Sequence, residues 1–151
     1  MHQLHRDIIL NVRSDELWDF IATPKNLNQL TPAELDFKIL SDIPEHMYNG
    51  LTILYEIKIP LLGQRRWLTE IKHIRDGISF VDEQLIGPYK LWYHYHEVKA
   101  IGSDRTRMTD RVHYRLPFEP LSRPVHEFWL KNMLEGIFDY RSARLKELFP
   151  D

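Results

Sequence analysis

The sequence predicts an α+β domain in which helices cover one face of an antiparallel sheet. Between residues 51 and 116, apolar and polar side chains alternate with a period of two, and short turn segments separate the runs. This pattern indicates strands connected by hairpins. From residue 125 to residue 149, apolar residues recur every three or four positions, which is typical of one amphipathic helix. A sheet with its helices on one side is the α+β arrangement.

The first part of the chain adds a strand and two short helices. The apolar residues of segment 3–12 fall mainly on one parity, which predicts a half-buried strand at an edge or joining point of the sheet. Ser14 is a suitable N-cap, and acidic residues follow it in the first turn of the expected helix. This helix should end near Pro24. A second helical turn over residues 26–30 should end before Pro32, because the residue that precedes a proline disfavours helical geometry.

Further strands are expected along the middle of the chain, at residues 51–59, 66–74, 78–85, 89–98 and 106–116. Turn residues separate them, such as Asp76-Gly77 and Gly87-Pro88. With the first strand and an extended segment after residue 35, the sheet should contain about seven strands. A sheet of this size twists, so it should curve around the long helix and leave a gap suited to a ligand.

The last helix should cover up to 25 residues, from 125 to 149, with a length of roughly 37 Å. Its expected buried face consists of Phe128, Trp129, Met133, Leu134, Ile137, Phe138, Leu145 and Leu148. Gly136 lies inside this helix, where glycine costs about 1 kcal/mol relative to alanine. We therefore expect another segment to pack closely against Gly136.

Composition restricts the functions that this chain can have. A length of 151 residues fits one domain, which we place at residues 1–151. With 20 basic and 22 acidic residues, the charge balance argues against nucleic acid as a partner. The chain has no cysteine, which excludes disulfides and cysteine-ligated metals and fits a cytoplasmic location. No apolar segment approaches the roughly 20 residues of a membrane span, and none resembles a signal peptide. Composition leaves the oligomeric state open.

Segment 106–116 places an acidic residue on the inner face of the sheet. One parity carries the basic residues Arg105, Arg107, Arg111, His113 and Arg115, which must face water. The other parity then turns inward, with Asp110 among Met108, Val112 and Tyr114. Acids are rarely buried without a partner. Asp110 is therefore either a ligand-facing or proton-transferring acid, or a structural acid paired with an arginine, a histidine or backbone amides.

The preceding strand places two histidines on the same face. If Val98 packs inward beside Met108, then Trp92, His94 and His96 face the cavity together with Asp110. Histidines two residues apart on a strand lie about 6–7 Å from each other, a spacing that binds a metal if a third ligand is present. The nearest acid, Glu97, faces away from both imidazoles, so we expect no metal and no other cofactor. If ion pairing outweighs desolvation, a histidine that pairs with Asp110 should have a raised pKa, and Asp110 a lowered one.

The order of elements and several motifs resemble the START-like, or SRPBCC, superfamily with its helix-grip fold. The motifs are Leu30-Thr31-Pro32, Gly50, Trp67 with Glu70-Ile71, Phe80-Val81-Asp82-Glu83-Gln84, Gly87-Pro88-Tyr89, Trp92-x-His94-x-His96, Asp110-x-Val112-x-Tyr114-x-Leu116-Pro117 and Phe138-x-Tyr140-Arg141. More narrowly, the chain is similar to small bacterial ligand-binding SRPBCC proteins. The superfamily includes lipid-transfer domains, birch-pollen allergens and polyketide aromatase/cyclases. The resemblance implies a sheet wrapped around the last helix and a small-molecule ligand.

Three functions remain open at this point. We favour binding or carrying of a small, largely hydrophobic molecule of the lipid, polyketide or isoprenoid type. Its binding residues would be Trp67, Phe80, Trp92, His94, His96, Met108, Val112, Tyr114, Met133 and Ile137. The alternative is a polyketide cyclase- or dehydratase-like enzyme that uses His94, His96 and Asp110 as acid–base groups. In the third, aromatic side chains fill the cavity and the protein acts through partners. Convergence of the polar residues on a cavity of about 300 Å³ or more would favour ligand binding.

Overall fold

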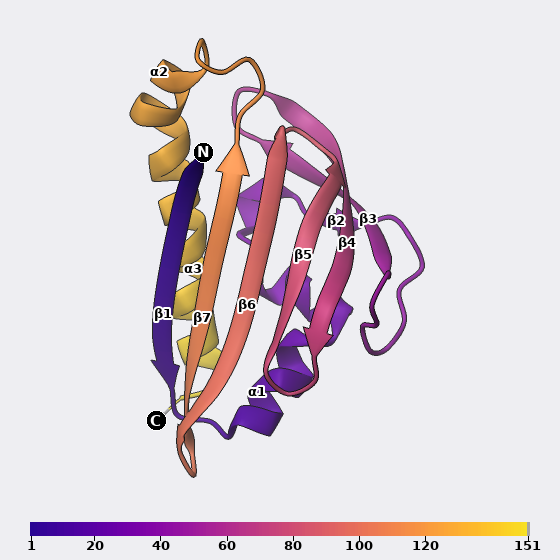
Figure 1. The fold of residues 1–151 in the computed structure, drawn as a ribbon, viewed down its shortest axis with the longest axis vertical. Coiled ribbons are helices and arrows are strands. Elements are labelled where there is room, and N and C mark those ends of the chain that lie inside the picture. The colour runs from indigo at the N-terminus through magenta and orange to yellow at the C-terminus, as the bar shows by residue number, and fades with distance from the viewer. Residues whose placement is uncertain (151) are drawn as a thin grey trace.

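The strands form one continuous antiparallel sheet. The computed structural model describes residues 1–150, so Asp151 of the predicted 1–151 domain lies outside the described residues. Within this range the strands are β1 (His2–Leu10), β2 (Lys38–Ile39), β3 (Thr52–Ile59), β4 (Gly63–Arg75), β5 (Ser79–Ile86), β6 (Leu91–Gly102) and β7 (Arg105–Arg115). Their spatial order is β1-β7-β6-β5-β4-β3-β2 (Figure 1). The predicted sheet of about seven antiparallel strands is confirmed, with β1 at one edge.

Short helices connect β1 to β2, as predicted. They are α1 (Ser14–Ile21) and the 3-10 helices η1 (Pro24–Leu30) and η2 (Ala33–Leu35). Ser14 is the first helical residue rather than the N-cap, a position that Arg13 takes without a side-chain cap hydrogen bond. Proline suits the first position of a helix because it has no N–H to leave unpaired. The second helix accordingly begins at Pro24, two residues before the predicted start.

The C-terminal helix is continuous from Arg123 to Leu148 and contains one π-helical turn. Its parts are α2 (Arg123–Val125), η3 (His126–Leu130) and α3 (Lys131–Leu148), and the residues at both junctions have helical dihedral angles. A π turn inserts one extra residue and so shifts the buried face. Phe128, expected in the core, is 85% exposed, whereas His126 and Leu130 are buried. A Cβ atom on Gly136 would meet nothing within 4 Å, so the predicted close packing there is wrong.

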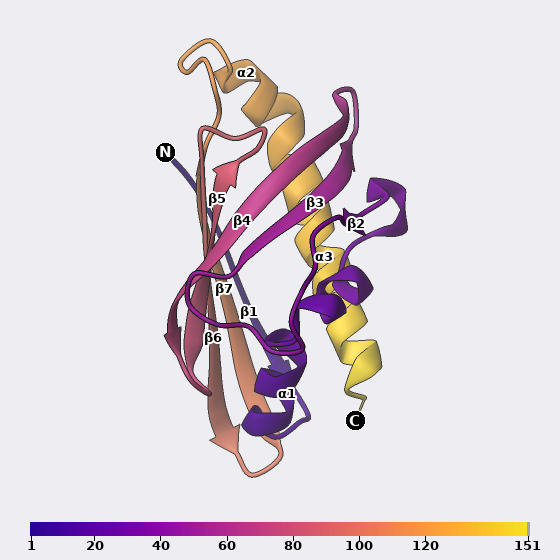
Figure 2. The same ribbon diagram turned by 90° about the vertical axis from the view of Figure 1, so that its right-hand side faces the viewer.

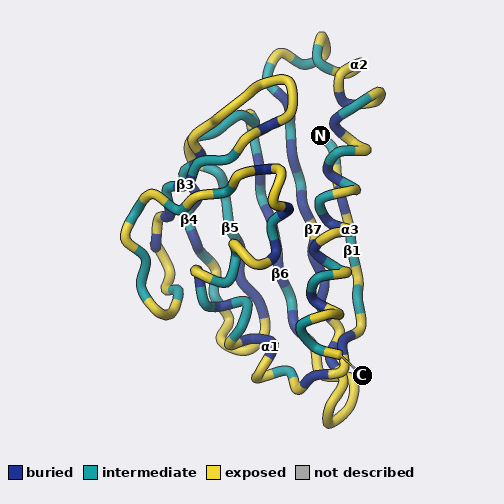
Figure 3. The backbone as a smooth tube through the Cα atoms, turned by 180° about the vertical axis from the view of Figure 1, so that it is seen from behind, coloured by how far each residue is buried: buried dark blue, intermediate teal, exposed yellow. Residues whose placement is uncertain are grey.

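The helices lie on the concave face of the curved sheet (Figure 2). The helix α3 contacts β1 and η1, while α1 contacts β6 and β7. Seen from the helix side, α3 runs along β1 and β7, and the chain between α1 and β3 lies over the other half of the sheet (Figure 3). The architecture is the predicted helix-grip arrangement. None of the helices in residues 1–150 is both long and apolar enough to cross a membrane.

Candidate ligand-binding site

A largely apolar cavity of about 210 Å³ lies between the sheet and the helices. Its walls come from β3, β4, β5 and β6, from residues 20–37 and from one face of α3. Ligand pockets commonly measure about 300 Å³ or more. The cavity volume is therefore below the 300 Å³ that we took as favouring ligand binding. It suits a compact ligand unless the walls move apart.

Most of the predicted binding residues line this cavity: Trp67, Phe80, Trp92, His94, His96, Met133 and Ile137. The inward orientation of Met108, Val112 and Tyr114 is confirmed, since all three are at most 2% exposed, but they lie outside the cavity lining. They belong to β7, which α1 contacts. Two side chains of β7 also reach the C-terminal helix: the hydroxyl of Tyr114 lies 2.7 Å from His126 Nε2, and Asp110 pairs with Arg141.

Aromatic side chains that the sequence analysis did not select complete the wall. Tyr55 stacks on Trp67 with ring centroids 5.7 Å apart, and Tyr89 packs against Trp92 at 4.8 Å. Burial raises the pKa of both tyrosines, so their hydroxyls stay neutral near pH 7. The indole Nε1 of Trp67 is buried without a hydrogen-bond partner among the described residues. The alternation of segment 51–59 could have identified Tyr55, which shares its parity with Ile53 and Ile57.

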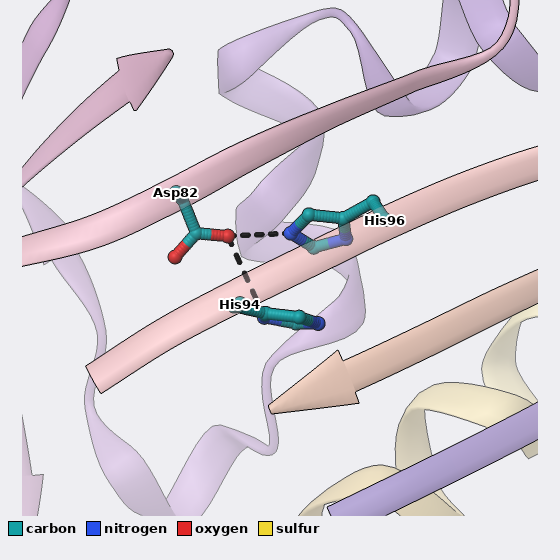
Figure 4. A group of neighbouring side chains, drawn as sticks. All are labelled: Asp82, His94 and His96. Atoms are coloured by element: carbon teal, nitrogen blue, oxygen red, sulfur yellow. Dashed lines mark hydrogen bonds and ion pairs between the residues drawn. The ribbon is translucent and has the colours of Figure 1, made fainter. Parts of the chain in front are cut away.

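A cluster of charged and titratable residues forms one end of the cavity wall. His94 Nε2 lies 2.8 Å from Asp110 Oδ1, and His96 Nε2 lies 2.5 Å from Asp82 Oδ2. Two longer contacts close a ring: His94 Nδ1 is 3.5 Å from Asp82 Oδ2 (Figure 4), and His96 Nδ1 is 3.0 Å from Asp110 Oδ1. Strand β6 carries both histidines between the two acidic strands, with Asp82 opposite His94 and Asp110 opposite His96.

Two members of this cluster were missed as site residues. Asp82 has the same parity as Phe80, so its inward position was visible in the alternation of segment 78–85. Arg141 projects from α3, and its Nε lies 3.4 Å from Asp110 Oδ2. It follows Phe138 by three positions, which is the spacing of one helical face. Helix and sheet thus meet in an ion pair at the end of the cavity.

The cluster shifts the pKa values of the two histidines in opposite directions. Burial lowers the pKa of His94, and the nearby charge of His96 adds to this effect. Burial also acts on His96, but its hydrogen bonds with Asp110 and Asp82 outweigh burial and raise its pKa. For Asp110, burial is opposed by the charge of Arg141 and by both histidines, which hold its pKa well below the usual range. The expected rise of a histidine pKa and the expected fall of the Asp110 pKa are thus found at His96 and Asp110, whereas at His94 desolvation outweighs ion pairing.

Comparison with solved structures finds the same fold in other proteins. A START superfamily protein from Mycobacterium smegmatis matches with a TM-score of 0.69 and 12% sequence identity. The alignment covers 98% of this chain and 99% of that protein. The Zhui aromatase/cyclase from a Streptomyces species matches with a TM-score of 0.71 and 11% sequence identity, and the alignment covers 95% of this chain and 90% of that protein. A major latex-like protein from Panax ginseng matches with a TM-score of 0.69 and 14% sequence identity, and the alignment covers 99% of this chain and 98% of that protein.

Sequence comparison adds nothing to these structural neighbours, since neither protein-family models nor curated proteins match this chain. The structural similarity nevertheless spans almost the whole chain, including the sheet and the C-terminal helix. The protein therefore has the START-like, or SRPBCC, helix-grip fold that the sequence motifs indicated. At these identities the similarity concerns the fold, and membership of the narrower bacterial group stays a prediction.

Proposed function

We propose that this protein binds a small, largely hydrophobic molecule that carries one polar group. The observation behind this proposal is the composition of the cavity: an apolar and aromatic wall ends in the buried cluster of Asp82, His94, His96 and Arg141. In such pockets the apolar surface supplies most of the binding free energy, and a few polar groups fix the orientation. The apolar part of the ligand would lie along Tyr55 and Trp67, with its polar group at the histidines.

The same features narrow the ligand class. A volume of about 210 Å³ favours a compact ring system or a short chain of the lipid, polyketide or isoprenoid type. Arg141 favours a polar group that is acidic or accepts hydrogen bonds, because a guanidinium only donates. The proposal includes a cytoplasmic location, which fits a chain without cysteine and which cell fractionation would test.

Native mass spectrometry of the purified protein and titration with an apolar fluorescent probe test this proposal. We expect a retained small molecule or a probe that binds one to one. The variant His94→Gln should keep the fold and lose affinity for the retained molecule, because it changes a polar group that faces the cavity. His5→Gln, at an exposed position on β1, is the matched control and should bind normally. A protein that retains no molecule and binds no probe would refute the proposal.

A second function, cyclase- or dehydratase-like catalysis, rests on a different observation. His96 contacts Asp82 at 2.5 Å on the cavity side, and Asp110 holds both imidazoles from behind. An imidazole oriented by a carboxylate and open to a substrate is the usual arrangement for general acid–base catalysis. The similar fold of an aromatase/cyclase supports this candidate.

Product analysis separates catalysis from binding. A poly-β-keto model substrate would be incubated with the protein, and the products would be identified by mass spectrometry. The enzyme proposal expects a dehydrated or cyclised product that disappears in His96→Gln while probe binding persists. An unchanged substrate with normal probe binding would leave binding as the function.

A further inference from the structure

Three atoms of the kind that ligate metals converge on the cavity side of the polar cluster. They are His94 Nδ1, His96 Nε2 and Asp82 Oδ2, and all lie within 4.8 Å of one another. The carboxylate oxygen lies 2.5 Å from the His96 nitrogen and 3.5 Å from the His94 nitrogen (Figure 4). Two imidazoles and one carboxylate form a common donor set for zinc and related divalent ions, with further coordination positions left open.

The opposite side of the two imidazoles has the partner that such a site requires. Asp110 Oδ1 lies 2.8 Å from His94 Nε2 and 3.0 Å from His96 Nδ1. A histidine that binds a metal usually directs its other ring nitrogen to a carboxylate, which fixes the ring and its tautomer. With an ion bound, both rings would be neutral and would direct their N–H groups to Asp110, because a carboxylate only accepts hydrogen bonds. Their lone pairs would then face the ion beside Asp82.

Without an ion, a proton holds His96 Nε2 and Asp82 Oδ2 together in a hydrogen bond of 2.5 Å. A divalent ion would take the place of that proton and bind the three ligand atoms together. The histidine side chains are only 8% and 6% exposed, and the side chain of Asp82 is 19% exposed. Phe80 stacks on His96 with ring centroids 4.3 Å apart, which further restricts the movement of that ring.

We propose that His94, His96 and Asp82 bind one divalent transition-metal ion of the zinc type, with Asp110 as the residue that orients both imidazoles. Ligand bonds of about 2.0–2.2 Å in a tetrahedral site separate the ligand atoms by about 3.4 Å. The Asp82 carboxylate must therefore retreat from His96, and the cavity that it borders provides the room. The orientation of Glu97 led us to expect no metal, but Asp82 of the neighbouring strand β5, opposite His94, offers a third ligand.

The charges of the cluster indicate what the open side of the ion would accept. Asp82 and Asp110 contribute two negative charges, and Arg141 contributes one positive charge. A divalent ion with neutral histidines would leave the cluster with a net charge of about +1. The remaining coordination positions face the cavity, so they suit water, hydroxide or the anionic group of a bound molecule. The metal site does not depend on the hydrophobic ligand, since its protein ligands are complete without one.

Cobalt titration of the full chain, without a polyhistidine tag and stripped of metals, tests the proposal directly. One equivalent of Co²⁺ should produce visible absorption bands typical of four- or five-coordinate cobalt. One equivalent of Zn²⁺ should abolish these bands, and calorimetry should give one Zn²⁺ per chain. Bound Zn²⁺ should also raise the unfolding temperature, because the ion binds only the folded arrangement. A wild-type protein that shows no such bands and takes up no Zn²⁺ would overturn the proposal.

Variants assign the site to these residues. His96→Ala and the isosteric Asp82→Asn should each lower Zn²⁺ affinity at least tenfold, and Asp110→Asn should lower it by about 10- to 100-fold. The control is His5→Gln, which removes the exposed histidine that lies 3.2 Å from Asp7 and should not change the affinity. Circular dichroism confirms folding, and Asp82→Asn keeps the test informative if His96→Ala fails to fold. Equal affinity in wild type and Asp82→Asn would assign the ion elsewhere. Probe binding, measured separately, distinguishes this failure from a failure of the proposed ligand function.

Discussion

The two halves of the sheet face the same side of the molecule but meet different partners. In the half made by β1 and β7, α3 contacts β1, α1 contacts β7, and Met108 and Val112 are completely buried. Along β3 and β4 the cover consists of η1, η2 and the connecting chain, and Ile57 lines an open cavity instead of a packed core. A straight helix fills only the strip of a curved sheet beneath it. The cavity therefore results from the curvature of the sheet together with the shortness of the other helices.

The polar cluster lies on the border between these halves. Asp110 belongs to β7 in the packed half, and Asp82 belongs to β5 beside the cavity. The histidines of β6 connect them, and Arg141 attaches the cluster to α3. One group of side chains thus has a structural side and a cavity side. Variants on the two sides should behave differently.

The largest loss of stability is expected from Asp110→Ala, on the structural side of the polar cluster. This change leaves Arg141 and two histidines without their buried acceptor and should lower the free energy of unfolding by about 3–5 kcal/mol. Urea denaturation measures the effect. The control Asp104→Ala, in the exposed turn between β6 and β7, should stay within about 0.5 kcal/mol of wild type. A loss below about 1 kcal/mol for Asp110→Ala would show that the cluster does not stabilise the packed half.

The next largest losses of stability are expected from truncating one buried apolar side chain in each half of the sheet. Met108→Ala opens a new void in the packed core and should cost about 2–5 kcal/mol. Ile57→Ala only enlarges an existing cavity and should cost clearly less, because fewer neighbours lose contacts. Parallel urea denaturation of the two variants compares them. Equal losses would mean that the cavity half is packed as tightly as the half beneath α3.

The sequence predicted the orientation of side chains better than their distance from the helix. The basic parity of segment 105–115 required Asp110 to face inward, and the position of Val98 opposite Met108 correctly oriented both histidines. Alternation within a strand does not reveal which inward residues reach the cavity, so Met108 was predicted to line it, although it is buried outside the cavity lining. A π turn leaves no signal in a period of 3.6, which explains the error at Phe128.

Asp82 and Arg141 were missed as site residues for a related reason. Asp82 meets His94 through pairing between β5 and β6, and Arg141 reaches Asp110 across the gap between helix and sheet. Register between strands and the crossing of a helix over a sheet depend on the whole fold rather than on any single segment. The individual strands could therefore be predicted from the sequence, whereas the cluster that they build required the structure.

A smaller effect on stability, with a large effect on binding, is expected from Ile137→Trp. Ile137 projects from α3 into the cavity, so the larger side chain should occupy space that a ligand would use. Overpacking of a filled core costs about 1–3 kcal/mol, but a void can accept the added atoms, and we expect a change below about 1 kcal/mol. Affinity for an apolar probe should fall at least tenfold. Unchanged probe affinity would show that the probe binds outside this cavity.

The smallest effect is a gain in stability from Gly136→Ala, on the outer side of α3. Glycine inside a helix is less favourable than alanine by about 0.8–1.0 kcal/mol, because it loses more backbone entropy on folding. A Cβ atom at this position meets nothing within 4 Å, so no steric penalty opposes the gain. The midpoint of urea denaturation should rise accordingly, and probe affinity should stay at the wild-type value because Gly136 lies outside the cavity lining. A loss of stability would mean that another surface covers this face of α3 in solution, which size-exclusion chromatography of the wild-type protein would reveal as an oligomer. A gain without change in binding would confirm that α3 contributes to the cavity through its inner face and that its outer face is free.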